Sequence, residues 1–274
     1  MKIPCQNIYA REKCFFCKVT KQLLNLPQKN VPMFSKKYLI VMAAGHGSRM
    51  GADLPKQFLS LGGKAILHRT IEKFEAACPD IRVITVLPVE ERYTEYWKDY
   101  CLHSGFTMSQ ILVRGGITRF HSVRNALSHL PSGAIVAIHD GVRPLVSPEL
   151  IRSMFERIEE DQTCEALIPV LPSVDTLRRL VKTNEDGHEV LSCPIDSAVD
   201  RNEIFAIQTP QIFRSGLIKY AYEKLPYSAS FTDDASVAFE AGIRLSFCKG
   251  ERLNFKITTK EDLSLAEMVI ARKH

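Results

Sequence analysis

The stretch "LIVMAAGHGSRMGADLPKQF", Leu39–Phe58, decides how this chain folds. It begins as an apolar run typical of a buried strand and then passes through three glycines. The loop matches neither common phosphate-binding pattern. GxxxxGK[ST] requires a lysine after the last glycine, and GxGxxG would need a third glycine where Met50 stands.

The composition of this loop nevertheless suits a polyphosphate. Glycines let backbone N–H groups approach an anion, and Arg49 and Lys56 add positive charge. In α/β folds, ligands bind at the carboxyl edge of parallel strands, where this loop would lie. The alternative interpretation is a surface turn with two solvated cations.

Apolar runs and helical patterns alternate outward from this strand. This order predicts a Rossmann-like α/β fold, with a mainly parallel sheet and helices on both faces. Ser147 and Pro148 are expected as the N-cap and first residue of one helix. We expect strands within 38–45, 81–88, 109–116, 134–146 and 164–172, and helices within 65–77, 93–105, 119–130 and 147–160.

One segment interrupts the alternation. Residues 175–201 hold two β-like runs around the turn signal "NEDG", which predicts a protruding hairpin arm within about 171–202. Such an arm is either a surface decoration or a means of reaching a partner subunit.

A second polar cluster follows an apolar strand in "IHDGVRP". Asp140 would lie at the carboxyl edge of the sheet beside the glycine-rich loop, where a carboxylate suits Mg²⁺. The alternative is an Asx turn, in which the carboxylate accepts from its own backbone.

The net charge of +5 is unevenly distributed. Residues 1–38 hold eight of the 36 Lys and Arg residues but one of the 31 acidic residues, so the remainder carries 28 basic and 30 acidic groups. This balance argues against a broad nucleic-acid-binding face. No apolar run reaches the ~18 residues that span a bilayer, and no signal peptide is recognisable, so we expect a cytoplasmic protein without a membrane partner.

The N-terminal segment lacks periodicity. We expect residues 1–34 to be a flexible basic extension, with Met33 as an alternative start, and residues 35–274 to form one domain. Cys14 and Cys17 form a C-x-x-C pair, which indicates either a zinc or redox site or ordinary reduced cysteines.

The chain resembles the 2-C-methyl-D-erythritol 4-phosphate cytidylyltransferases over residues 37–272. The resemblance rests on nine motifs in order: "AAGHGSRMG", "PKQF", "GGITRFHSV", "HDGVRP", "DTLRR", "VDR", "QTPQIF", "FTDDAS" and "NFKITTKEDL". It implies transfer of CMP from CTP to 2-C-methyl-D-erythritol 4-phosphate with release of pyrophosphate, with Mg²⁺, by a homodimer that exchanges its hairpin arms.

The resemblance also implies roles for individual residues. Arg49 and Lys56 would be catalytic, and Asp140 would bind both CTP and the metal. The other CTP-binding residues would be Ala43, Ala44, Gly45, Gly47, Ser48, Gly115 and Ser122. The acceptor-binding residues would be Arg143, Thr176, Arg201, Thr209, Thr232 and Lys256, with Thr176 and Arg201 reaching the neighbouring subunit.

Two alternatives remain open. A ribitol-5-phosphate or other polyol-phosphate cytidylyltransferase would share the CTP-binding half and differ in the acceptor pocket. A catalytically silent nucleotide-binding module would belong to a different class, although such a module would have no need for the whole set of charged residues.

Overall fold

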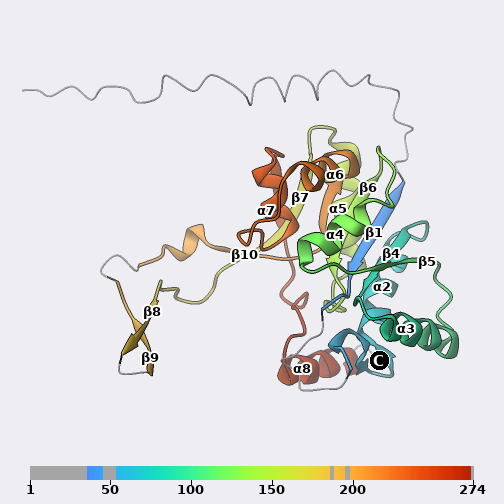
Figure 1. Ribbon diagram of the computed structural model, residues 1–274, viewed down its shortest axis with the longest axis horizontal. Helices are drawn as coiled ribbons and strands as arrows, with labels where there is room; N and C mark the ends of the chain where they lie inside the picture. Colours follow the sequence, from blue (N-terminus) through green and yellow to red (C-terminus); the bar gives the residue numbers. More distant parts are fainter. Residues whose placement is uncertain (1–35, 46–53, 186–187, 195–197, 273–274) are drawn as a thin grey trace, which may run out of the picture. The chain divides into compact units, whose positions relative to one another are not determined.

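The computed structural model describes residues 36–45, 54–185, 188–194 and 198–272. Most of the described strands join one central sheet, drawn in Figure 1. The strands of this sheet are β1 (Lys37–Met42), β4 (Arg82–Leu87), β5 (Gln110–Arg114), β6 (Ile135–Asp140), β7 (Ala166–Pro172), β10 (Phe205–Ile207), β11 (Gln211–Arg214) and β12 (Leu245–Lys249).

The sheet runs in the order β10-β7-β11-β6-β1-β4-β5, with β12 paired to β7. Strands β6, β1, β4 and β5 are parallel to one another, whereas β10 and β11 pair antiparallel to their neighbours. The register pairs Met42 with Asp140, the last residues of β1 and β6. The loops that follow these two strands therefore leave the sheet side by side.

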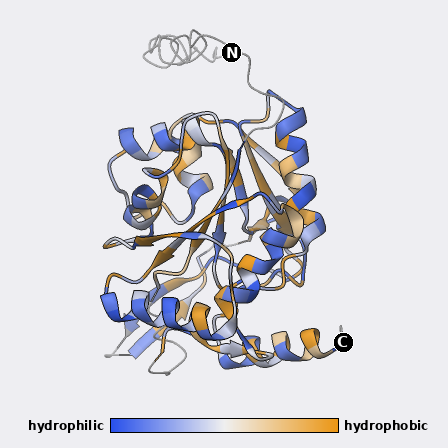
Figure 2. Cartoon of the chain, turned by 90° about the vertical axis from the view of Figure 1, so that its right-hand side faces the viewer, coloured by the Kyte–Doolittle hydropathy of each residue, from blue (hydrophilic) through white to orange (hydrophobic). Residues whose placement is uncertain are grey.

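Alternate residues of β1 point to opposite faces of the sheet, as a strand requires. Leu39 and Val41 pack into one hydrophobic core, and Tyr38 and Ile40 into another. Figure 2 shows the apolar strands enclosed between helices with polar outer surfaces. Helices α2 (Ile66–Ala77), α3 (Glu91–Ser104) and α5 (Pro148–Glu160) cover the first face; α4 (Arg119–Leu127), α6 (Ser215–Lys224) and α7 (Asp234–Glu240) cover the second.

A third, smaller core lies under α8 (Lys260–Ala271). It joins Leu61 and Ile66 to Val142 and Ile257, and the backbone bond from Ile257 N to Val142 O is 2.9 Å long. This packing fixes the segment before α8 beside the loop after β6. The remaining short elements are η2 (Lys56–Phe58), β2 (Ser60–Leu61), β3 (Lys64–Ala65) and η3 (Arg201–Glu203).

The predicted α/β fold with helices on both faces is confirmed. The predicted start of α5 is also confirmed, because the Ser147 side chain accepts a hydrogen bond from Leu150 N and Pro148 is the first helical residue. The hairpin is present as β8 (Val181–Glu185) and β9 (His188–Ser192), which pair with each other. No helix within the described ranges is long and apolar enough to cross a membrane.

Candidate active site

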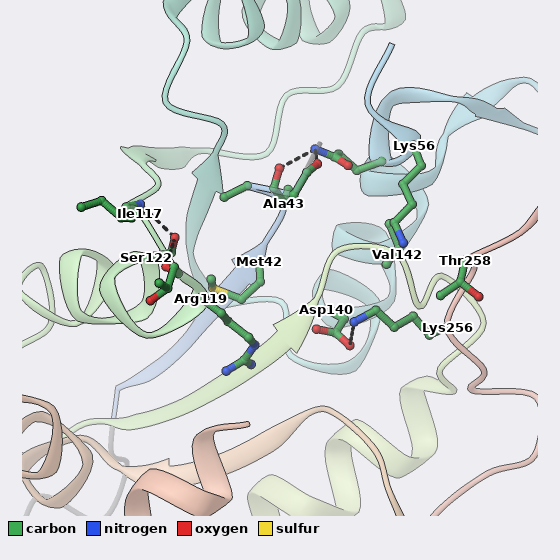
Figure 3. A pocket seen from close by; sticks show the side chains of 15 residues that line it. Met42, Ala43, Lys56, Ile117, Arg119, Ser122, Asp140, Val142, Lys256 and Thr258 are labelled. Carbon is green, nitrogen blue, oxygen red and sulfur yellow. Dashed lines mark hydrogen bonds and ion pairs between the residues drawn. The ribbon is translucent and has the colours of Figure 1, made fainter. Parts of the chain in front are cut away.

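A cavity of about 460 Å³ opens at the carboxyl ends of β1 and β6, and Figure 3 shows the side chains around it. Its walls come from segments far apart in the sequence. They are formed by Met42, Ala43, Ala44, Gly45, Lys56, Gln57, Gly116, Ile117, Thr118, Arg119, Ser122, Asp140, Val142, Lys256 and Thr258.

The loop after β1 is held by Gln57, which is almost completely buried. Its side-chain amide donates to the carbonyl of Ala43 at 2.6 Å and to the carbonyl of Gly45 at 3.0 Å. These bonds occupy two backbone carbonyls of the predicted phosphate loop. Lys56, the neighbour of Gln57 in η2, lines the same cavity. Gly47, Ser48 and Arg49 lie outside the described residues.

Gly115 directly precedes the opposite wall, is not among the lining residues itself, and packs tightly against the loop after β1. A Cβ atom at Gly115 would come within 2.7 Å of the Ala44 Cβ, so a larger side chain would force the two segments apart. Beside it, Gly116 N donates to Ser122 Oγ at 2.9 Å, and Ser122 Oγ donates to Thr118 O at 2.9 Å. The wall is therefore fixed by its own hydrogen bonds.

Arg119 extends from the start of α4 and is anchored by a buried carboxylate. Its Nη1 and Nη2 atoms lie 2.8 and 2.5 Å from the two carboxylate oxygens of Asp234, whose side chain is 0% exposed. Tyr222 donates to the same carboxylate at 2.7 Å. Burial lowers the pKa of Arg119, but Asp234 more than reverses this, so the guanidinium stays charged.

Two cations hold Asp140 at the base of the cavity. Arg143 Nε and Lys256 Nζ each lie 3.1 Å from Asp140 Oδ2, and Figure 3 shows Lys256 extending toward this carboxylate. Burial by itself would raise the pKa of Asp140. The charges of Lys256, Arg119 and Arg143 instead lower it well below its usual range, so the carboxylate is ionised.

Comparisons with known proteins point to one family over almost the whole domain. The profile of the 2-C-methyl-D-erythritol 4-phosphate cytidylyltransferase family matches residues 38–272. A protein of that name from Phocaeicola vulgatus is 43% identical over 234 residues, which cover 85% of this chain and 99% of the relative. Another from Bacteroides fragilis is 41% identical over 231 residues, covering 84% and 98%.

The chain belongs to this cytidylyltransferase family.

Solved structures of family members share the fold. The 4-diphosphocytidyl-2C-methyl-D-erythritol synthase from Anaerococcus prevotii has a TM-score of 0.66 and 28% identity, covering 87% of this chain and 99% of its own. The 2-C-methyl-D-erythritol 4-phosphate cytidylyltransferase from Francisella tularensis has a TM-score of 0.66 and 30% identity, covering 85% and 99%.

The cavity brings together part of the set of residues that the family resemblance implies. Lys56, Ser122, Asp140 and Lys256 line it, together with Ala43–Gly45. Arg143 is not a lining residue but forms an ion pair with Asp140, which is one. Thr209 is not a lining residue either, and its hydroxyl accepts a hydrogen bond from Asp140 N. In the part of the chain that the structure describes, Thr176, Arg201 and Thr232 are exposed and are not among the lining residues.

Three residues with clear positions in the site received no role from sequence reasoning. Arg119 and Gln57 occur in "GGITRF" and "PKQF", where the motifs alone do not reveal their partners. Asn254 is completely buried, and its backbone carbonyl accepts from Arg143 Nη1 at 2.8 Å. The sequence feature that could have indicated Asn254 is its position in "NFKIT", two residues before Lys256.

The donor set at Asp140 is compatible with one divalent cation. Mg²⁺ is usually held by one or two carboxylates, waters and substrate phosphate oxygens. The described residues contain no cluster of three or more His, Cys, Asp or Glu side chains that could form a complete protein site. A metal here would therefore be held by Asp140 together with the phosphates of a nucleotide.

Proposed function

We propose that this chain transfers the cytidylyl group of CTP to 2-C-methyl-D-erythritol 4-phosphate and releases pyrophosphate. The main support is that Lys56, Asp140 and Lys256 line one cavity beside the glycine-rich loop. Relatives of this name, matched over almost their full length, support the choice of nucleotide and acceptor.

The reaction joins two anions. A phosphate oxygen of the acceptor attacks the α-phosphorus of CTP, forming one P–O bond, while the bond to the pyrophosphate oxygen breaks. The attacking oxygen is already ionised, so the site needs no strong general base. Its main task is to orient both substrates and offset their repulsion.

The cations of the site divide this task. Lys56 would stabilise the charge that develops around the α-phosphate, together with Arg49 of the glycine-rich stretch. Lys256 and Arg143 would face the acceptor phosphate while keeping Asp140 ionised. Mg²⁺, held by Asp140, would supply further charge neutralisation on the triphosphate.

Pyrophosphate release tests this function directly. The chain is incubated with CTP and either 2-C-methyl-D-erythritol 4-phosphate or ribitol 5-phosphate, with and without EDTA. We expect release with the first acceptor, and its loss when EDTA removes the metal. Faster release with ribitol 5-phosphate would identify the other polyol class, and release with neither acceptor would favour a silent nucleotide-binding module. Equal turnover of CTP, ATP and UTP would contradict the choice of CTP as the nucleotide.

We also propose that two copies of the chain exchange their hairpin arms. The segments around β8 and β9 carry exposed apolar side chains, and a two-stranded hairpin is at best marginally stable alone in water. A two-fold dimer would cover both arms and bring Thr176 and Arg201 to the partner's acceptor site. The exposed side chains are Val174, Leu177, Leu180, Val181, Val190 and Leu191.

Subunit mixing tests this exchange. Arg201→Ala and Lys56→Ala chains are each expected to be nearly inactive alone. If Arg201 acts in the partner's site, a mixed dimer has one site with both defects and one intact site, so activity returns. If Arg201 acts in its own subunit, both mixed sites are defective. If activity does not return although mass spectrometry verifies that subunits have mixed, the proposed exchange of arms is refuted.

The cytoplasmic location remains a prediction.

A further inference from the structure

A chain of hydrogen bonds behind the cavity joins the backbone of Asp140 to the backbone of Arg143. Asp140 N donates to Thr209 Oγ1 at 3.1 Å, and Thr209 Oγ1 lies 3.0 Å from His139 Nδ1. His139 Nε2 lies 3.2 Å from the carbonyl oxygen of Arg143. His139 is 0% exposed and Thr209 5% exposed, so water does not compete for these bonds.

The chemistry of the partners fixes the direction of each bond. A carbonyl oxygen only accepts, so His139 Nε2 carries a hydrogen. A neutral imidazole then has an unprotonated Nδ1, which accepts the hydroxyl hydrogen of Thr209. The Thr209 oxygen in turn accepts from Asp140 N. This assignment leaves the hydroxyl with no hydrogen to donate to an anionic phosphate.

His139 is completely buried, and burial favours the neutral imidazole that this assignment requires. The ring is further held edge-on against Phe74, with centroids 5.0 Å apart. The imidazole therefore has a fixed position between the carbonyl of Arg143 and the Thr209 hydroxyl that accepts from Asp140 N.

Asn254 restrains the same turn from the other side. Its side-chain Nδ2 donates to the carbonyl of Thr209 at 2.8 Å, and its backbone carbonyl accepts from Arg143 Nη1 at 2.8 Å. The turn itself is closed by a bond of 3.1 Å from Arg143 N to Asp140 O. The backbone of this turn and the Arg143 side chain are thus held by groups that are not among the residues lining the cavity.

We propose that His139 and Thr209 are positioning residues of the transfer reaction, which hold Asp140 and Arg143 in their reactive orientation. This inference rests on the proposed cytidylyl transfer. It gives His139 a role that the family resemblance did not imply. It also replaces the direct acceptor contact expected of Thr209 with an indirect one.

Three variants separate these roles. Thr209→Val removes the hydroxyl with little change in shape. His139→Gln retains a donor where Nε2 stood but removes the acceptor at Nδ1. Thr209→Ser retains the hydroxyl. Thr85→Val is the matched control, because Thr85 is also completely buried and donates to Gln110 Oε1 at 2.7 Å, away from the cavity.

We expect Thr209→Val and His139→Gln each to lower kcat by about 10- to 100-fold, the scale of small misplacements of reacting groups. The KM values for CTP and acceptor should stay within about twofold, since neither side chain binds substrate. The double variant should be no worse than the poorer single one, because both break the same chain. Thr209→Ser should recover most of kcat, and Thr85→Val should lower Tm without lowering kcat.

Two results would overturn the proposal. A raised acceptor KM in Thr209→Val with kcat unchanged, together with normal His139→Gln kinetics, would make Thr209 a substrate contact. Lower Tm in both variants with kcat intact would make the chain purely structural. Failure of the proposed function is distinguishable, because the unsubstituted chain would then release no pyrophosphate.

Discussion

Replacement of Arg119 by methionine tests how strongly the buried ion pair supports the site. Arg119→Met keeps the length and apolar stem of the side chain but leaves the Asp234 carboxylate buried without its cation. Loss of one partner from a buried pair costs about 3–5 kcal/mol of unfolding free energy. For a domain of this size, that corresponds to a fall in Tm of roughly 6–20 °C.

The two ends of this pair differ in exposure, so the two single substitutions should differ in effect. The Asp234 side chain is 0% exposed, whereas that of Arg119 is 31% exposed. In Asp234→Asn the guanidinium can regain contacts with water, so the expected loss is smaller, about 1.5–3 kcal/mol for a hydrogen bond to a charged group. The double variant Arg119→Met with Asp234→Asn buries no charge. It should be more stable than Arg119→Met alone.

Urea unfolding followed by circular dichroism measures these differences. Arg114→Met is the matched control, because Arg114 pairs with Glu91 at 3.3 Å and both side chains are well exposed. An exposed pair of this kind contributes about 0–1 kcal/mol. If Arg119→Met destabilises the chain no more than Arg114→Met does, the buried pair does not stabilise this wall of the cavity, and the reasoning is refuted.

Three further predictions follow from the charged groups and the N-terminus. Arg49→Ala and Lys56→Ala should each lower kcat by about 100-fold or more with Tm unchanged, and an effect on KM alone would show that they only bind substrate. Asp140 has a lowered pKa in the folded state, so its contribution to stability is present above the unfolded value of about 3.9 and lost as the pH falls below it. Asp140→Asn should therefore flatten the acid side of the Tm-against-pH profile measured in EDTA, and an unchanged slope would contradict the assigned charge pairing. A chain shortened to begin at Met33 should keep its activity and Tm, whereas loss of either would show that residues 1–32 contact the domain.

Up to residue 172, the order of strands and helices could be predicted from the sequence, because each is specified by local patterns. The apolar run at 38–42 has to be buried on both faces, and the helices that follow it show a 3.6-residue period that supplies the covering surfaces. The start of α5 at Ser147 and Pro148 is equally local. The glycines and cations of the loop after β1 indicated an anion for the same reason, since backbone access and charge are properties of the residues themselves.

The contacts between side chains far apart in the sequence follow from the tertiary structure and not from local patterns. Arg119 and Asp234 are 115 residues apart, and His139 and Thr209 are 70 apart, so no local period relates them. Their contacts depend on the register of β6 and β11 and on the packing of α4 and α7 against α6. The neighbouring cations then keep Asp140 ionised, and the carbonyl of Arg143 selects the tautomer of His139, because the free energy of a charge or a hydrogen depends on all surrounding groups at once.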